Sequence, residues 1–536
     1  MLPTHRIRLD RSAGPAQLVV DDRLTLIIGA ELHNSSSSTV EAMEHGVARV
    51  AALGARCVLA PIAWESVEPE EGHFDLTLID AFIQTCRRHE INGIPLWFGA
   101  WKNGASMYTP EWVKTNPKRF PRALDADGMP LDSLSPFADE LAQADAAAFS
   151  QVMQRVHELD HDATMLMVQI ENEIGLLASA RDHSPAASAA WAASVPDELI
   201  STLNDDDGSR LRDAWLRNGQ RTGTDWVATF GDNDLASEAF MAWGYSRHVQ
   251  KVAAAGRAQH DVPLFVNAWL DSAKTTEGLA LGGGQRPGDY PSGGPLVQVA
   301  PVWRTFAPEI DLLCPDAYHE GVDLTLQRFT HASGGLFIPE MRRDADGVGT
   351  AFIAIGTHSA IGISPFGVDS FQDDEHLPLA DGYRLLTAAA PAVLAARAEH
   401  RKVIGFHLNG PSGTATLDFD DLFFHVRPWS GFVAARDDAR GYGLIVQESD
   451  DTYLIVGRGF VAVPALRDGT RVAPLTVDEL DTTGANEKVL RRLNGDETLS
   501  GRGVAHPALG MRNPAGHPIP ANVTTSGLAR MRIYKF

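Results

Sequence analysis

Eight short apolar runs alternate with longer segments of helical spacing between about Leu24 and Phe366. In chain order the runs are LTLIIGAEL, RCVLAPIAW, IPLWFGAW, TMLMVQIE, PLFVNAWL, IDLLCPDAY, GGLFIPEM and AIGISPFGV. Runs of this length without polar alternation are typical of strands buried on both faces, as in a parallel sheet. The segments between them, such as LTLIDAFIQTCRRHEIN, have the spacing of amphipathic helices. Eight strand–helix units predict an α/β fold of the (β/α)8 barrel type.

An open, doubly wound sheet is the alternative, but that fold usually carries a Gly-rich phosphate loop directly after a strand. The segment GLALGGGQRPG at 278–288 follows no predicted strand and lacks that spacing. The barrel is therefore favoured. Residues 176–225, rich in Ala, Ser and Asp, are expected to be an insertion after the fourth strand. It either shapes the substrate site or is a plain surface insertion.

The sequence changes character from about Ala395. Short alternating stretches such as KVIGFHLNG, ATLDFDDLFFHVR and the terminal RMRIYKF, separated by Gly and Asp turns, predict a β-sandwich. We expect a barrel domain over 1–395, including a short β segment at 1–23, and a sandwich domain over 396–536. The sandwich is either a carbohydrate-binding module or a structural brace and subunit interface. The sequence has no clear row of Trp residues there, which favours the brace.

The net charge of −23 over 536 residues argues against nucleic acid or an anionic membrane as a partner, because both require a basic face. No stretch approaches the roughly 20 apolar residues of a membrane span. The start, MLPTHRIRLD, lacks the apolar core of a signal peptide. These features favour the cytoplasm; removal of an export signal would instead imply the periplasm or secretion.

Three cysteines, Cys57, Cys86 and Cys314, lie in or beside apolar runs. An odd and sparse set has neither a disulfide framework nor the spacing of metal ligands, so buried free thiols are expected. The strand ends show no His/Asp ligand set either. We therefore expect neither a metal nor another cofactor.

Chemistry in a (β/α)8 barrel is carried out by residues at the carboxyl ends of the strands. The polar and aromatic residues at the eight predicted ends, in chain order, are Glu31, His33 and Asn34; Trp64, Glu65 and Glu68; Trp101, Lys102 and Asn103; Glu171, Asn172 and Glu173; Asn267 and Trp269; Asp316, Tyr318 and His319; Glu340 and Arg342; and Phe366 and Asp369.

Isolated carboxylates end the fourth and seventh strands, on opposite sides of the ring. Two carboxylates that face each other across a pocket are the requirement for glycoside hydrolysis. Several Trp residues at strand ends could stack on sugar faces. Taken singly, Glu173 could be a surface residue, Glu340 a partner of Arg342, and each Trp an ordinary packing residue. Together the two carboxylates favour a glycosidase, because both directly follow apolar runs.

Two segments resemble glycoside hydrolase family 35, the β-galactosidases. VQIENEIG resembles the strand-four motif of that family, whose clan carries an Asn-Glu pair after strand four and a lone Glu after strand seven. WESVEPEEGHFDL at 64–76 is similar to the strand-two signature, and His33 lies where the family has a His. The resemblance covers about residues 24–395.

The resemblance implies that Glu173 is the general acid/base, Glu340 the nucleophile, Asn172 the ligand of the sugar 2-hydroxyl and Tyr318 a hydrogen-bond donor to the nucleophile. Glu171 and Arg342 are expected to be supporting residues. The further residues expected to bind substrate are Trp101, Asn103, His33 and Trp269.

Three positions depart from the family pattern. Ala100 stands where a Glu that binds the galactose hydroxyls is usual, Asn34 stands in place of a Tyr, and MRRDADG follows the strand-seven Glu. Near strand seven the sequence is similar to family 42. SPFG and the C-terminal domain resemble a divergent bacterial branch of family 35 that includes enzymes acting on galactosylated plant oligosaccharides, such as xyloglucan fragments.

We therefore expect a retaining, exo-acting β-galactosidase with a small oligosaccharide substrate. The alternatives on the same mechanism are a family 42-like β-galactosidase, an α-L-arabinopyranosidase, a β-mannosidase or a β-glucosidase. A metal-dependent aldolase or amidohydrolase, and a non-catalytic sugar-binding protein, are the rivals from other classes. A homo-oligomer is expected from the resemblance alone.

Overall fold

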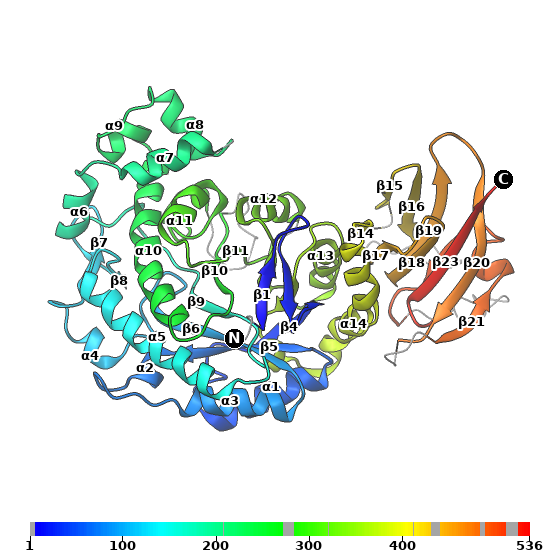
Figure 1. Cartoon of the computed structure of the whole chain (residues 1–536), viewed down its shortest axis with the longest axis horizontal. Coiled ribbons are helices and arrows are strands. Elements are labelled where there is room, and N and C mark those ends of the chain that lie inside the picture. Colours follow the sequence, from blue (N-terminus) through cyan, green and yellow to red (C-terminus); the bar gives the residue numbers. More distant parts are fainter. Residues whose placement is uncertain are drawn as a thin grey trace.

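The computed structural model describes residues 6–206, 208–271, 284–319, 321–410, 412–429, 440–482, 488–510 and 524–536. Within these ranges eight parallel strands form one sheet, in the order β11, β10, β9, β6, β5, β4, β13, β12. The sheet closes where Ala317, just after β11, pairs in parallel with Met341 of β12. The predicted (β/α)8 barrel is confirmed, and Figure 1 shows it at the centre of the molecule.

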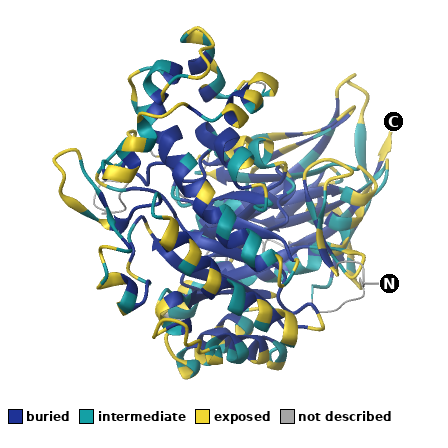
Figure 2. Ribbon diagram, turned by 60° about the vertical axis from the view of Figure 1, so that its left-hand side comes forward, coloured by how far each residue is buried: buried dark blue, intermediate teal, exposed yellow. Residues whose placement is uncertain are grey.

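Nearly every residue of the barrel strands is buried, because side chains fill the interior and helices cover the outside (Figure 2). The strands are β4 (Ile27–Glu31), β5 (Cys57–Ala63), β6 (Asn92–Lys102), β9 (Val168–Asn172), β10 (Leu264–Ala268), β11 (Leu312–Pro315), β12 (Phe337–Met341) and β13 (Gly362–Pro365). Continuous burial explains why the sequence shows apolar runs rather than alternation.

The larger helices that follow the barrel strands are α1 (Val40–Ala52), α3 (Thr77–Arg88), α5 (Asp139–Leu159), α10 (Asp234–Arg257), α11 (Ala300–Phe306), α12 (Asp323–Ser333), α13 (Ala345–Gly356) and α14 (Leu377–Ala398). Side-chain caps fix where several of them begin. Thr39 accepts from the amide of Ala42 in α1, and Asn233 accepts from the amide of Ala236 in α10. Such caps satisfy amides that have no partner within the helix.

Insertions between strands and helices surround the mouth of the barrel. Short ones contain α2 (Trp64–Val67), α4 (Glu111–Lys114), β7 (Arg122–Leu124) and β8 (Pro130–Leu134). The segment after β9 folds into α6 (Pro185–Trp191), α7 (Asp197–Asp205), α8 (Arg210–Arg217) and α9 (Trp226–Phe230). Helices α7 to α9 project as a lobe at the upper left of Figure 1. Short 3-10 turns η1 (Val297–Val299), η2 (Val368–Ser370) and η3 (Asp373–His376) complete the barrel domain.

Two antiparallel sheets follow the barrel and form the predicted β-sandwich. The six-stranded sheet contains β14 (Val403–Asn409), β17 (Arg440–Gln447), β18 (Thr452–Arg458), β23 (Leu528–Lys535), β20 (Val472–Leu480) and β21 (Val489–Leu493), in that order. The four-stranded sheet contains β15 (Ala415–Phe419), β16 (Leu422–Pro428), β19 (Phe460–Leu466) and β22 (Val504–His506), preceded by η4 (Gly495–Thr498). Side chains of both sheets share one core.

In the six-stranded sheet, β17 and β18 are buried on both faces. The second face of the sheet packs on α13 and α14, so that Leu444, Val456 and Leu528 belong to the barrel core. Helix α14 ends at Ala398, so the boundary predicted at 395/396 falls in its last turn. At the other end of the chain, β1 (Ile7–Asp10), β2 (Gln17–Val20) and β3 (Arg23–Thr25) form a small antiparallel sheet.

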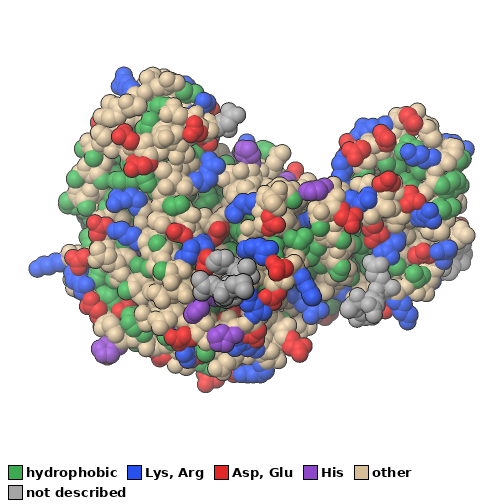
Figure 3. Space-filling view, in the orientation of Figure 1, with side chains coloured by type: hydrophobic (Ala, Val, Ile, Leu, Met, Phe, Trp, Pro, Cys, Tyr) green, Lys and Arg blue, Asp and Glu red, His purple; other side chains and the backbone are tan. Residues whose placement is uncertain are grey.

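On the face shown in Figure 3, acidic and basic side chains are interspersed despite the strongly negative net charge. All three cysteines are buried free thiols, as expected. Among the described residues, no helix combines the length and apolar character needed to cross a membrane.

Candidate active site

Three carboxylates from three strand ends converge at the mouth of the barrel. Oxygens of Glu173, which follows β9, Asp316, which follows β11, and Glu340, in β12, lie within 4.8 Å of one another. Their residues are 7%, 2% and 4% exposed, respectively. Because each strand is an apolar run, its polar end residue is carried to the same edge of the sheet. The structure thus brings together the two carboxylates singled out in the sequence.

Glu340 accepts hydrogen bonds on both carboxylate oxygens. The Tyr318 hydroxyl donates to Oε2 at 2.8 Å. The Asn172 amide donates to Oε1 at 3.0 Å, and the Asn267 amide reaches the same atom at 3.4 Å. Lys102 Nζ lies 3.8 Å from Oε1. These donors stabilise a negative charge on Glu340.

Glu173 has the opposite electrostatic environment. Burial, followed by the negative charge of Glu340, raises the pKa of Glu173 to about 8, although the Lys102 charge and a hydrogen bond to Asp316 act in the other direction. Its backbone amide donates to Asn267 Oδ1 at 2.9 Å, which fixes the start of the loop. Glu173 is therefore protonated near neutral pH and able to donate a proton.

Lys102, at the end of β6, orients Asn172. Its Nζ donates to Asn172 Oδ1 at 2.7 Å, so the amide NH2 of Asn172 faces Glu340. Burial lowers the pKa of Lys102, but the nearby carboxylates Glu340 and Glu173 outweigh this effect and the pKa is raised. Lys102 is therefore a buried cation between the two carboxylates.

Besides Glu173 and Glu340, the site contains two more acids, Glu31 and Asp316. Burial raises the pKa of Glu31 and of Asp316 well above the usual range, and the charge of Glu340 adds to both shifts. Neither Glu31 oxygen has a hydrogen-bond partner among the described residues, and neither does Asp316 Oδ1. Asp316 Oδ2 accepts from Asn267 at 2.9 Å. The site thus contains more carboxyl groups than the two of the expected mechanism.

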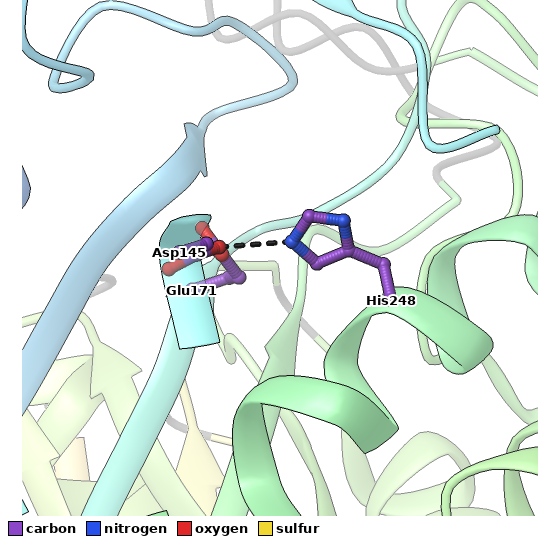
Figure 4. A group of neighbouring side chains, drawn as sticks. All are labelled: Asp145, Glu171 and His248. Carbon is purple, nitrogen blue, oxygen red and sulfur yellow. Dashed lines mark hydrogen bonds and ion pairs between the residues drawn. The ribbon is translucent and has the colours of Figure 1, made fainter. Parts of the chain in front are cut away.

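The Glu171 side chain lies beside Asp145 and opposite His248 of α10 (Figure 4). Its carboxylate accepts from the backbone amides of Ala100 at 3.1 Å and Trp101 at 2.7 Å. It also lies against Asp145 of α5, which pairs with His248 of α10. Burial, and then Asp145, raise the pKa of Glu171 well above its usual range. These contacts are consistent with the supporting role expected for Glu171.

Two expected site residues lie away from the three carboxylates. The Trp101 side chain is fully buried and packs edge-on against Tyr245 and His248, with its indole N–H donating to the Leu134 carbonyl. The ring is therefore not available to stack on a sugar. Arg342 forms ion pairs with Asp344 and, at 3.5 Å, with Asp346.

Three other expected residues lie around the mouth without a described contact to Glu173 or Glu340. His33 Nε2 bonds to Ser370 Oγ at 2.8 Å, and its ring packs edge-on against Phe366. Asn103 is exposed, and its backbone amide donates to the Asn172 carbonyl. Trp269 is half-buried just after β10. Their roles in substrate binding stay predictions.

Four residues of the site, Glu31, Lys102, Asn267 and Asp316, stand among the predicted strand-end residues but were given no role in the expected mechanism. Each was visible as a polar residue closing an apolar run, and that position is the signal that could have found them.

Two groups of side chains have the composition of a metal site: Glu173, Asp316 and Glu340, and Asp145, Glu171 and His248. In the second group the carboxylate oxygens already accept hydrogen bonds. In the first, the Lys102 ammonium already provides a positive charge. Both arrangements fit hydrogen-bonded clusters without a cation.

Comparison with known proteins matches residues 379–505 to a family described as a domain of unknown function, DUF5597. No curated protein matches the chain. Among solved structures, a β-galactosidase from the haloarchaeon Halorubrum lacusprofundi is 16% identical with a TM-score of 0.45, over 68% of this chain and 58% of that one. A GH42 β-galactosidase from G. stearothermophilus is 13% identical with a TM-score of 0.48, over 69% and 57%.

The catalytic domain of a β-amylase from Paenibacillus polymyxa is 12% identical with a TM-score of 0.43, over 66% of this chain and 96% of that one. By contrast, this chain spans less than two thirds of the length of either of the two β-galactosidases above. At these values the likeness concerns the barrel, and function has to rest on the site residues.

Proposed function

We propose that this protein is a retaining β-glycosidase that removes terminal sugars from oligosaccharides, with Glu340 as nucleophile and Glu173 as general acid/base. One observation carries the proposal. Glu340, whose carboxylate is held by three donors, faces the buried carboxyl group of Glu173, whose pKa is raised to about 8, and one oxygen of each lies within 4.8 Å of the other. Retaining enzymes have their carboxyl groups about 5–5.5 Å apart, whereas inverting enzymes need ~6.5–9.5 Å to admit a water molecule.

In the first step Glu340 attacks the anomeric carbon while Glu173 gives its proton to the departing glycosidic oxygen. The bond to the leaving group breaks as the bond to Glu340 forms, leaving a covalent glycosyl-enzyme. Asn172 stays beside Glu340 during this step, because its NH2 group donates to Glu340 and its carbonyl accepts from Lys102. Tyr318 stays bonded to the other oxygen of Glu340.

The second step requires Glu173 to become a base. The negative charge of Glu340 is one cause of the raised pKa of Glu173, and this charge disappears when Glu340 is esterified. The pKa of Glu173 then falls, so it can take a proton from the water that hydrolyses the intermediate. The same pair of carboxyl groups thus alternates its roles without a cofactor.

We further propose β-galactosides as the substrates, including galactosylated plant oligosaccharides. The support is the resemblance of VQIENEIG and WESVEPEEGHFDL to family 35. The hydroxyl contacts must differ from those of that family, because Ala100 replaces its usual Glu. Buried acids such as Glu31 and Asp316, with oxygens that lack a partner among the described residues, are available to accept substrate hydroxyls.

The test is a panel of aryl β-galactoside, β-glucoside, β-mannoside and α-L-arabinopyranoside, assayed with wild type, Glu340→Ala and a control, Glu41→Ala, on the exposed face of α1. We expect one sugar to be preferred, wild-type rates for the control and no turnover by Glu340→Ala. NMR of the first product should show the anomer of the substrate. No turnover of any member, or an inverted first product, would contradict the proposal.

A further inference from the structure

A second buried polar cluster lies behind the candidate active site and has no part in the proposed mechanism. It consists of Asp145 on α5, Glu171 on β9 and His248 on α10, which we call the support cluster (Figure 4). Asp145 and Glu171 are fully buried and His248 is 1% exposed. Burying such groups costs several kcal/mol unless hydrogen bonds compensate, so their retention requires a reason.

The carboxylate oxygens of the support cluster all have donors. Asp145 Oδ1 accepts from the Trp97 indole at 2.8 Å, and Asp145 Oδ2 lies 2.9 Å from His248 Nε2. The Glu171 oxygens accept from the amides of Ala100 and Trp101. The His248 ring also packs edge-on against Trp101, with the ring centroids 4.5 Å apart. The cluster is therefore directed at a short stretch of β6.

That stretch is a bulge. Trp97 pairs with Ile170 of β9, but the next pair is Lys102 with Asn172, so residues 98–101 on β6 loop out beside a single residue of β9. We call residues 98–101 the β6 bulge. A Cβ at Gly99 would lie 2.4 Å from Trp97 Nε1, 2.7 Å from Asp145 Oδ1 and 2.8 Å from Glu171 Oε1. The β6 bulge thus fits tightly against the support cluster.

The β6 bulge ends at the residue that orients the catalytic groups. Lys102 directly follows it, and Lys102 Nζ holds Asn172 and lies 3.8 Å from Glu340. Without the bulge, the last residues of β6 would be displaced along the strand relative to β9. The position of the Lys102 side chain is therefore coupled to whatever holds the bulge in place.

We propose that Asp145 and His248 are positioning residues for the glycosidase reaction: acting through Glu171, they hold the β6 bulge and thereby set Lys102 against Asn172 and Glu340. This inference rests on the proposed function. It assigns the support cluster a task that neither the catalytic carboxylates nor the substrate contacts perform.

A specific pH signature follows. Glu173 is faced by Glu340 from β12, Lys102 from β6, Asp316 from β11 and, at the floor, Glu31 from β4. Lys102 is the cation of this set, and its charge lowers the pKa of Glu173. If Lys102 moves away, the pKa of Glu173 rises. The alkaline limb of the pH profile of kcat/KM then shifts to higher pH, an effect that a general loss of stability does not produce.

The first experiment compares Asp145→Asn with Asp139→Asn, a control at an exposed position on the same helix. We expect Asp145→Asn to lower kcat about 10- to 100-fold through misplacement of Lys102, with the alkaline limb shifted upward as in Lys102→Met. In the Lys102→Met background, Asp145→Asn should cost little more, because its effect passes through Lys102. A full additional loss in the double variant would overturn the proposal.

His248 is tested by two replacements. His248→Gln keeps a donor toward Asp145 and should retain most of the activity, whereas His248→Phe removes the donor and should behave like Asp145→Asn. Equal losses in the two variants would contradict a role through the hydrogen bond.

Hydrogen–deuterium exchange separates this proposal from the proposed function. Peptides covering residues 98–104 should exchange faster in Asp145→Asn than in wild type, and should be unchanged in Asp139→Asn. Unchanged exchange in Asp145→Asn would overturn the positioning role whatever the activity. A wild-type protein inactive on every glycoside would instead contradict the proposed function, while the exchange result would still decide whether the cluster holds the β6 bulge.

Discussion

The end of β9 supplies carboxylates to two buried clusters with opposite properties. Glu173 faces Asp316 and Glu340 at the barrel mouth, where Asp316 Oδ1 has no partner among the described residues. Glu171, two residues earlier, faces Asp145 and His248, and its oxygens accept backbone amides. A cluster with unfilled carboxylate acceptors can bind a substrate, whereas one whose carboxylate oxygens are all hydrogen-bonded holds structure.

Backbone conformation separates the two clusters. Residues two apart on a regular strand point to the same face. Glu171 and Glu173 point to different sides because both leave the β region, with φ of +58° and +44°. A non-Gly residue pays on the order of 1–2 kcal/mol for such a conformation. Strain of this kind is typical of functional sites, and here it separates Glu173, at the barrel mouth, from Glu171, in the support cluster.

The largest effect is expected at the mouth. Glu340→Ala should lower kcat on the order of 10⁴-fold or more, because the variant lacks the carboxylate that forms the covalent intermediate. The thermal midpoint should not fall, since one of several buried acids is removed. Addition of azide should restore turnover of an aryl glycoside and give a glycosyl azide of inverted configuration. Near-normal activity of Glu340→Ala would mean that the carboxylates at the mouth differ from the support cluster in no way that matters for catalysis.

Glu173→Ala is expected to have the next largest effect, and one that depends on the leaving group. Substrates with poor leaving groups should lose about 10²–10⁴-fold, whereas activated aryl glycosides should lose far less in the first step. In wild type, kcat/KM should fall above a pH of about 8, where Glu173 loses its proton. Equal losses on both substrate types, or an unchanged alkaline limb in the variant, would argue against Glu173 as the acid.

The two Trp residues sharpen the comparison. Trp101→Ala, beside the support cluster, should lower the free energy of unfolding by about 3–5 kcal/mol, as expected for a fully buried ring. Trp269→Ala, at a half-buried position just after β10, should leave unfolding nearly unchanged and raise KM. Denaturant unfolding and steady-state kinetics on both variants distinguish the cases. A stable Trp101→Ala variant with a raised KM would mean that Trp101 binds substrate rather than packing in the core.

The last variant, Glu171→Ala, tests the support cluster itself. It leaves the amides of Ala100 and Trp101 without their acceptor, at a cost of about 1–3 kcal/mol for each buried group. Stability measured in denaturant should fall, and the pH profile should shift in the direction of Lys102→Met. Unaltered stability would mean that water replaces the carboxylate, and the support cluster would then not hold the bulge.

The barrel could be predicted because strands buried on both faces appear in the sequence as continuous apolar runs. The sandwich could be predicted because strands buried on one face show alternating apolar and polar residues. Glu173 and Glu340 could be found for a related reason: a carboxylate directly after such a run is unusual. The direction of Trp101, Arg342 and Glu171 could not be predicted. The directions of Trp101 and Glu171 depend on the β6 bulge and on the positive φ of Glu171, which lie against α5 and α10. Arg342 pairs instead with Asp344.

Helix α14 has a consequence for how this chain can be divided or inherited. It is the last helix of the barrel domain, yet it also packs on the six-stranded sheet. Asp381 in α14 forms a buried ion pair with Arg458 in β18 at 2.9 Å. The match to the domain of unknown function also begins inside this helix, at residue 379. Recombination that exchanged the C-terminal sheets without α14 would break a shared core. We therefore expect the helix and the sheets to be inherited together as one unit.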